Sequence, residues 1–294
     1  MKRVGFIALI GDANVGKSTF INSLVGVKCL AVSDKPQTTR ENIKAIYNTE
    51  DSQLIFIDTP GFHRPRGDFG RLLIKDAKQA LSDCDVVIYM VDISMKINYD
   101  LVDKLKKIDQ PLFVILNKID KLKSISEYEK RAEKYYNLFK ELPKNHFASI
   151  VAKDKEVPHF LIEEVKSLLP MTEPYFPDDM LLDHPIEFVY QEFIKEKCMR
   201  LCYDEVPHAV HVKVIHVEED DSNIDITADI IVEKESERAI IVGKGGKMIS
   251  KIRSYSENSI RGFTGKACSL SLFVKVTKNW REDRRKITEF GYTE

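Results

Sequence analysis

VGFIALIGDANVGKSTFINSL, residues 4–24, indicates the fold class of the first half of this chain. Its apolar run Val4–Ile10 predicts a buried strand, and residues 19–24 have helical spacing. The turn between them, GDANVGKS, carries two glycines, a lysine and a serine at the spacing of a phosphate-binding loop. A strand, this turn and a helix in this order predict a site for a nucleoside triphosphate.

Each part of the loop has an expected role in binding phosphate. Gly11 and Gly16 let the backbone fold around the phosphates, so that its N–H groups and the helix N-terminus point at them. Lys17 reaches the outer phosphates, and the Ser18 hydroxyl binds Mg²⁺. The predicted nucleotide contacts of the loop come from Gly11, Asp12, Ala13, Asn14, Val15, Gly16, Lys17, Ser18 and Thr19.

A second motif, DTPG, ends the predicted strand Leu54–Asp58. Asp58 is expected to hold Mg²⁺ through water, and the Gly61 N–H to contact a γ-phosphate that is lost on hydrolysis. Between the two motifs lies PQTTR, residues 36–40, whose Thr39 hydroxyl is expected to complete the magnesium shell. The predicted metal ligands are Ser18, Thr39 and Asp58, and DTPG adds nucleotide contacts from Asp58, Thr59, Pro60 and Gly61.

A third motif, NKID, residues 117–120, ends another predicted strand, where a nucleotide base would lie at the carboxyl edge of the sheet. The Asp120 carboxylate matches the adjacent N1–H and N2–H donors of guanine, which adenine does not offer. Asn117 and the Lys118 stem are expected to brace that pocket. The three motifs in this order predict a GTPase rather than a P-loop kinase or an ATPase.

Hydrolysis needs a group other than the residue that follows DTPG. That residue is Phe62, whose apolar side chain cannot orient an attacking water. Asn14 is placed to help hold a monovalent cation, K⁺, against the phosphates, where the cation would neutralise transition-state charge as an arginine finger does. The predicted catalytic residues are Asn14, Lys17, Thr39 and Gly61.

The whole chain has 294 residues, enough for two domains of roughly 100 to 200 residues each. No stretch approaches the roughly 20 apolar residues of a membrane helix, and no secretory signal precedes the first strand. Five scattered cysteines fit reduced thiols, and the cytoplasm is the expected location. Cys198 and Cys202 are expected to pack in a core rather than to bind a metal, because no neighbouring Cys or His completes a tetrahedral set.

The first half alternates apolar runs with segments of helical spacing, which predicts an α/β domain with a mostly parallel sheet. Buried strands are expected at 4–10, 54–58, 86–91, 112–117 and 147–151, with an edge strand at 44–47. Helices are expected at 19–25, 69–81, 100–108, 126–142 and 160–169. Four prolines at 170, 174, 177 and 185 then predict a stiff linker. The expected domains are 1–170 and 185–294, joined by the linker 171–184.

The second half predicts an α+β domain. Expected are a helix at 185–202, strands at 209–217, 225–233 and 269–276, a short strand at 238–242, a helix at 247–262 and a basic tail helix. From Arg238 to Lys286 there are thirteen Lys and Arg residues against three acids, which suggests a polyanionic partner. Trp280 is expected to pack the terminal helix; stacking on bases, or contact of the basic tail with anionic lipid, are the alternatives.

The turn Gly243-Lys-Gly-Gly246 is expected to lie between the short strand and the following helix. Such a GXXG turn lets the backbone approach nucleic acid closely, and in KH domains it clamps about four nucleotides. Apolar residues lead into the turn and basic residues surround it, which favours single-stranded RNA as the ligand. The predicted RNA-binding residues are Gly243, Lys244, Gly245, Gly246, Lys247, Lys251 and Arg253.

Together these motifs resemble the Era family of bacterial ribosome-assembly GTPases over almost the whole chain. GDANVGKS, PQTTR, DTPGFHRPR, NKID, EPYFPDD and IVGKGGKMI occur in the order of that family, with a GTPase domain before a type II KH domain. The resemblance implies single-stranded RNA near the 3′ end of small-subunit ribosomal RNA as the ligand, and a checkpoint in 30S subunit assembly. It also implies Asn14 as a K⁺ ligand and weak peripheral membrane association.

Two positions depart from the family pattern. Asp12-Ala13 stands where Arg-Pro is usual, which changes the charge of the loop. Val151-Ala152-Lys153 stands where Ser-Ala is usual, so the Ala152 N–H is the expected contact to the guanine carbonyl without a serine beside it.

The leading hypothesis is a monomeric switch that hydrolyses GTP to GDP and couples nucleotide state to RNA binding. The competing hypothesis is an RNA-binding module in which GTP or GDP only stabilises the fold and turnover is incidental.

Overall fold

The computed structural model describes residues 1–61, 67–142, 145–154, 157–203 and 206–292. They form two compact units, each discontinuous in sequence. Unit 1 consists of residues 1–26, 39–64 and 73–183, and unit 2 of residues 27–38, 65–72 and 184–294. These units do not follow the linear division 1–170, 171–184 and 185–294, which stays a prediction.

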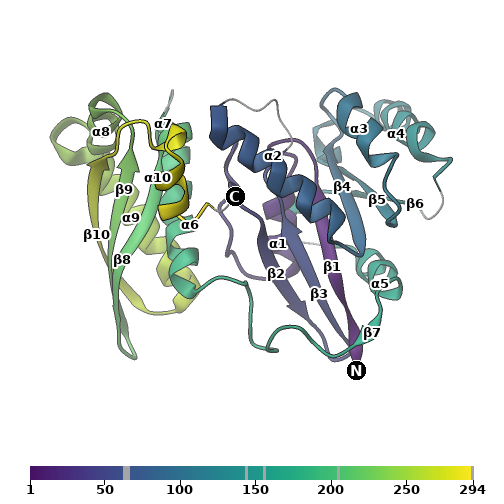
Figure 1. The fold of residues 1–294 in the computed structure, drawn as a ribbon, viewed down its shortest axis with the longest axis horizontal. Coiled ribbons are helices and arrows are strands. Elements are labelled where there is room, and N and C mark those ends of the chain that lie inside the picture. Colours follow the sequence, from purple (N-terminus) through teal and green to yellow (C-terminus); the bar gives the residue numbers. More distant parts are fainter. Residues whose placement is uncertain (62–66, 143–144, 155–156, 204–205, 293–294) are drawn as a thin grey trace. The chain divides into compact units, whose positions relative to one another are not determined.

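Unit 1 contains a seven-stranded sheet in the order β2-β3-β1-β4-β5-β6, with the short strand β7 paired to the start of β1 (Figure 1). β3, β1, β4, β5 and β6 are parallel, and β2 joins the edge antiparallel to β3. The strands are β1 (Lys2–Ile10), β2 (Ile43–Asn48), β3 (Ser52–Asp58), β4 (Val86–Asp92), β5 (Leu112–Asn117), β6 (Asn145–Ile150) and β7 (Met171–Thr172).

Burial explains why these strands are apolar along their whole length. Every residue of β3, β4 and β5 is buried, as expected for strands with neighbours on both edges and helices on both faces. The α-helices are α1 (Lys17–Leu24), α2 (Gly67–Ser82), α3 (Tyr99–Leu105), α4 (Ile125–Phe139) and α5 (His159–Ser167), with 3₁₀ turns η1 (Ile119–Lys121) and η2 (Ala152–Asp154). The first residues of α2 belong to unit 2 and the rest of the helix to unit 1.

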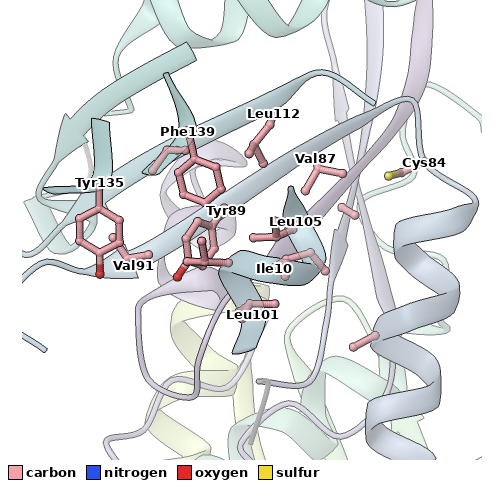
Figure 2. Packing of buried hydrophobic residues seen from close by; sticks show 14 of the residues in the cluster. Ile10, Cys84, Val87, Tyr89, Val91, Leu101, Leu105, Leu112, Tyr135 and Phe139 are labelled. Carbon is pink, nitrogen blue, oxygen red and sulfur yellow. The ribbon is translucent and has the colours of Figure 1, made fainter. Parts of the chain in front are cut away.

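Aromatic rings close the core between the sheet and α4. Figure 2 shows Tyr89 of β4 grouped with Tyr135 and Phe139 of α4, among apolar side chains from β1, β5 and α3. The Tyr89 ring centroid lies 6.5 Å from that of Tyr135 and 5.9 Å from that of Phe139, at edge-on angles that suit aromatic packing. These ring contacts therefore hold α4 against the sheet.

The proline-rich segment packs along unit 1. Thr172 and Met171 pair with Lys2 and Arg3, and Leu182 forms a bridge with Ala45 of β2. The side chain of Gln53 also accepts the backbone N–H groups of residues 175 and 176, at 2.8 and 3.0 Å. Long-range hydrogen bonds, which proline spacing does not reveal, hold this segment against the sheet.

Unit 2 contains a three-stranded sheet in the order β10-β9-β8, with β8 antiparallel and β10 parallel to β9 (Figure 1). Its strands are β8 (His211–Glu219), β9 (Asn223–Val232) and β10 (Ala267–Val276). Helix α6 (Ile186–Leu201) packs against β8 and against α9 (Lys247–Thr264), which contacts β10. The remaining elements are α7 (Val206–Ala209), α8 (Glu235–Val242), η3 (Lys244–Gly246), η4 (Trp280–Glu282) and α10 (Arg284–Glu289).

The predicted short strand 238–242 is wrong, because these residues belong to helix α8. The Glu237 carboxylate accepts the backbone N–H groups of Glu233 and Lys234, at 2.8 and 3.0 Å, and so satisfies donors at the start of the helix. β9 already has β8 and β10 as its two neighbours. The sheet therefore offers no place beside β9 for another strand.

The cysteines and the tryptophan of unit 2 lie in its core. Cys198 and Cys202 are buried, and within the described residues no group of His, Cys, Asp and Glu side chains is arranged to hold a metal. Trp280 is 0% exposed, and its indole N–H donates to the Ala209 carbonyl at 2.9 Å. The tryptophan therefore packs the tail, as predicted, and offers no free stacking face.

In the described part of the chain, no helix has the length and apolar content needed to span a membrane.

Candidate nucleotide-binding and RNA-binding sites

The phosphate loop lies where strand order reverses in unit 1, between the carboxyl end of β1 and α1. Gly16 adopts φ +109°, a conformation that favours glycine, and caps α1. The Lys17 ammonium donates to the carbonyls of Gly11 and Asp12, at 3.2 and 3.0 Å. Burial lowers the pKa of Lys17, while the carboxylates of Asp58 and Asp12 oppose that shift. The lysine is thus held at the loop on which phosphates are expected to bind.

Three oxygens from distant parts of the chain converge next to this loop. The Ser18 hydroxyl donates to Asp58 Oδ2 at 2.7 Å, and the Thr39 hydroxyl donates to the same oxygen at 3.0 Å. The two hydroxyl oxygens are 3.1 Å apart. Asp58 is fully buried at the end of β3. The structure therefore brings together the three predicted metal ligands.

The DTPG turn is pinned against the phosphate loop. The Thr59 hydroxyl donates to the Leu9 carbonyl at 2.6 Å, and Pro60 is buried. A Cβ on Gly61 would lie 2.6 Å from the Ala13 Cα, closer than a side chain tolerates. Only glycine lets the backbone at this turn approach the loop so closely. Phe62, the residue whose apolar character suggested cation-assisted hydrolysis, lies outside the described residues.

Asn117 links the phosphate loop, the NKID motif and the turn that carries Ala152 through its side-chain amide. Its amide donates to the Val15 carbonyl at 2.8 Å, and its Oδ1 accepts the N–H groups of Lys118 and Ala152, at 2.7 and 2.9 Å. The Ala152 carbonyl accepts from the Ser23 hydroxyl at 2.9 Å. The Ala152 N–H thus already serves Asn117 in this structure, and its contact with guanine stays a prediction.

The Lys118 ammonium reaches the phosphate loop. It donates to the Asn14 carbonyl at 2.5 Å, and Asn14 itself adopts φ +63°. The ammonium also lies 3.0 Å from Asp92 Oδ2, which is equally distant from the Lys121 ammonium. The Lys118 side chain thus extends from the NKID motif to the phosphate loop, and its role in bracing a guanine pocket stays a prediction.

Asp120 lies at the surface of the same edge. About a third of its side chain is exposed, and its Oδ2 is 2.5 Å from the Lys153 ammonium. This hydrogen bond raises the pKa of Lys153, the residue after Ala152. Asp120 is therefore in direct contact with the loop that carries Ala152, and its selection of guanine stays a prediction.

Two site residues were missed from the sequence. Asp92, at the end of β4, is buried; burial raises its pKa, but hydrogen bonds from Ser94, Lys121 and Lys118 lower it to about 2. Asn98 donates to the Asp12 carboxylate at 2.6 Å and so holds the acidic side chain that departs from the family pattern. The sequence pattern could have identified Asp92, because this residue ends a strand at the same sheet edge as Asp58 and Asn117. No sequence pattern pointed to Asn98.

The GXXG turn of unit 2 lies between helices α8 and α9 rather than between a strand and a helix. Gly243, Gly245 and Gly246 all have positive φ, and a Cβ on Gly243 would lie 2.7 Å from the Met248 Cβ. The turn is therefore a tight connection that brings the backbone to the surface in front of the N-terminus of α9.

The basic residues around this turn are exposed but do not share one face. Lys244 lies in the turn, and Lys247 and Lys251 are one helical turn apart on α9. Arg253 follows Lys251 by two residues, roughly 200° around the helix, and so points away from that face. In the tail, Arg281 pairs with Glu233 and Lys286 with Glu289, which leaves less free charge there than the sequence suggested.

Comparisons with known proteins agree over the full chain. Residues 6–118 match a family described as 50S ribosome-binding GTPase, and residues 205–281 match the KH domain family. The chain is 39% identical to GTPase Era of Clostridium tetani and 36% identical to GTPase Era of Staphylococcus haemolyticus. It covers 99% of the first and 97% of the second, with 99% of this chain aligned to each.

Solved structures give the same result. The chain superposes with a TM-score of 0.91 and 30% identity on Era in complex with MgGDPNP and nucleotides 1506–1542 of 16S ribosomal RNA. On an Aquifex aeolicus Era variant bound to GDP and AlF₄⁻ the TM-score is 0.90, with 31% identity. Both matches cover all of each chain. The predicted architecture, a P-loop GTPase domain with a mostly parallel sheet followed by a KH domain, is confirmed, and the chain is a GTPase of the Era family.

Proposed function

We propose that this GTPase couples GTP hydrolysis to the binding of the single-stranded 3′ region of 16S ribosomal RNA, and that it acts in 30S subunit assembly. One observation carries the proposal: Thr39 meets Ser18 and Asp58 beside the phosphate loop, while the residues directly before it, 27–38, pack with the KH domain in unit 2. The chain itself thus leads from the nucleotide site to the RNA-binding unit.

Magnesium fits the oxygen cluster at this site. Two hydroxyls and one carboxylate are hard oxygen donors, which Mg²⁺ prefers. Their oxygens lie within 3.1 Å of one another, where a cation would neutralise the charge of the Asp58 carboxylate. Ser18, Thr39 and Asp58 would hold the ion, with Asp58 acting directly or through water. When bound, Mg²⁺ supplies charge neutralisation for the β- and γ-phosphates.

The protein's own groups would position the nucleotide. Lys17 supplies a positive charge at the outer phosphates, and Gly61 presents its backbone N–H where a γ-phosphate is present only before hydrolysis. Asn117, Lys118 and Asp120 would select guanine. Asn14 would help to hold K⁺ against the phosphates, and GTP turnover should then be faster in K⁺ than in Na⁺; equal rates would remove K⁺ from the proposal.

On the RNA side, the GXXG turn and the Lys247 and Lys251 face of α9 would hold about four nucleotides. Binding of GTP would order the residues around Thr39 and Gly61, and hydrolysis would release them. The cytoplasmic location, the weak peripheral membrane association and the monomeric state stay predictions.

The decisive experiment measures affinity for a 16S ribosomal RNA 3′ oligonucleotide in the presence of a non-hydrolysable GTP analogue and in the presence of GDP. A switch requires different affinities in the two states, because a ligand that binds both states equally shifts no equilibrium. Equal affinities would instead favour an RNA-binding module in which nucleotide only stabilises the fold.

A further inference from the structure

A cavity lies on unit 1, and neither the phosphate loop nor the NKID motif lines it. It has a volume of about 750 Å³ and lies between the loop that follows β4 and one face of helix α4. We call it the basic pocket, and define it by Met95, Lys96, Tyr99, Lys130, Arg131 and Lys134. None of the residues predicted to bind nucleotide lines it.

The basic pocket carries an excess of positive charge. Lys96, Lys130 and Lys134 are exposed, and within the described part of the chain none of the three forms an ion pair. Glu127 is the single acid among the described lining residues, and Arg131 neutralises it through contacts of 3.0 and 3.1 Å. Three cations are therefore left to attract an anionic ligand.

The wall of the pocket is held rigid by hydrogen bonds. The Arg131 guanidinium donates to the carbonyls of Ile93 and Ser94, at 3.0 and 3.1 Å, and so ties α4 to the loop after β4. The Ser94 N–H in turn donates to Asp92 Oδ1 at 3.0 Å, and Asn98 caps α3 by accepting the Leu101 N–H at 3.1 Å. A ligand would meet a preformed site, which lowers the entropic cost of binding.

Exposed apolar surface lies next to the lysines. Tyr99 is 59% exposed and Met95 is 50% exposed, whereas Tyr135 is buried in the wall. Proteins that bind single-stranded nucleic acid combine cations for the phosphates with aromatic rings on which bases stack. An acidic protein segment would also pair with the lysines, but three cations beside an exposed ring are the combination that phosphates and a stacked base use together.

We infer that the basic pocket is a second RNA-binding site, which holds phosphates with Lys96, Lys130 and Lys134 and a base on Tyr99. The inference rests on the proposed RNA-binding function and extends it, because it places an RNA contact on the GTPase unit in addition to the KH turn.

The test uses the full chain and two RNA probes, whole 16S ribosomal RNA and a short single-stranded 3′ oligonucleotide. The double variant K130A/K134A removes two exposed lysines of the pocket, and K106A/K107A removes two exposed lysines beyond α3 that do not line it. Affinity is measured against salt concentration, because each phosphate contact to a single strand contributes about 0.7 to the slope of log affinity against log salt.

With 16S ribosomal RNA, K130A/K134A should reduce the slope by about 1.4, while K106A/K107A should keep the wild-type slope. Tyr99→Ala should weaken the same complex by at least about fivefold through lost stacking. With the short oligonucleotide, which the KH turn alone can hold, K130A/K134A should bind like the wild type.

Equal slopes for K130A/K134A and K106A/K107A on 16S ribosomal RNA would overturn the inference. An acidic protein would then be the better candidate for the ligand of the basic pocket. Failure of the wild type to bind the oligonucleotide would count against the KH assignment alone, since the slopes on 16S ribosomal RNA still judge the basic pocket.

Discussion

Asp120 is the residue on which base selection is expected to depend. Its carboxylate would accept two adjacent donors of guanine, and charge-assisted hydrogen bonds of this kind contribute about 1.5 to 3 kcal/mol each. In the structure it is partly exposed and bonded to Lys153, so a base can reach it once that ammonium moves aside.

Replacement of Asp120 by Asn should therefore weaken GTP binding by about a hundredfold or more and favour the xanthine nucleotide, whose C2 carbonyl accepts from the new amide. Titration with fluorescent GTP and XTP measures the change. Asp154→Asn, which neutralises an exposed acid of the neighbouring turn η2, is the matched control. Unchanged GTP affinity in Asp120→Asn would refute the guanine assignment.

Asp76 in helix α2 predicts a pH effect on stability. Burial, and then repulsion from Glu41, raise its pKa from 3.8 to about 6. The folded protein holds this proton more tightly than the unfolded chain does. The protonated Asp76 therefore contributes to the free energy of unfolding below about pH 4, and this contribution is lost as pH rises to about 6. Between these values, Asp76→Asn should show a smaller loss of unfolding free energy than the wild type.

Urea titrations at several pH values test this prediction. Asp83→Asn, which replaces an exposed acid just beyond the same helix, should keep the pH dependence of the wild type. Parallel stability curves for wild type and Asp76→Asn would show that Asp76 titrates alike in the folded and unfolded chains.

At the scale of elements, periodicity predicted the helices and strands of unit 1 well, because buried parallel strands are apolar throughout and surface helices repeat every three to four residues. It failed at 238–242, a short apolar run that suits a strand or a helix equally. The choice there depended on Glu237 binding the backbone N–H groups at the helix start, and on a sheet with no free place beside β9.

The GXXG turn offers the clearest variant of an element. A Cβ on Gly245 meets no atom within 4 Å, so Gly245→Asp is expected to fit with only the strain of a positive φ, which Asp tolerates better than most residues. The added carboxylate should repel phosphate and abolish binding of the 3′ oligonucleotide, while GTP hydrolysis without RNA should stay at the wild-type rate.

Gly265→Asp is the matched control, because Gly265 also has positive φ in open space but lies at the other end of α9. Filter binding and phosphate release measure the two activities. Retained RNA binding in Gly245→Asp would remove the turn from the proposed clamp.

At the scale of the whole molecule, helix α6 explains how residues 27–38 belong to unit 2. Two of its carboxylates are buried yet paired: Glu192 accepts the Ala31 N–H at 3.1 Å, and Glu196 accepts the Val32 N–H at 3.0 Å. Glu196 also accepts from Lys28 at 2.6 Å and from Lys197 at 2.8 Å. Buried carboxylates this well bonded are costly to disturb, so they anchor the segment that leads to Thr39.

The double variant E192Q/E196Q should loosen this anchor and reduce the difference in RNA affinity between the GTP-analogue and GDP states. It should also lower the free energy of unfolding, by about 3 kcal/mol or more, because lysines that remain lose buried partners. Fluorescence anisotropy with labelled oligonucleotide in each nucleotide state measures the coupling. Glu187→Gln on the same helix is the control, and a wild-type affinity ratio in E192Q/E196Q would contradict the anchoring role.

Residue types at fixed local spacing were enough to predict the phosphate loop, the DTPG and NKID motifs, the KH turn and the order of the two domains. Which distant groups come into contact is visible only in the folded chain. Thr39 meets Asp58, Asp92 meets Lys118, residues 27–38 meet α6, and α4 meets the loop after β4 to form the basic pocket. Such contacts join segments far apart in the chain, and hydrogen bonds between them leave no periodic pattern in the residues that separate them.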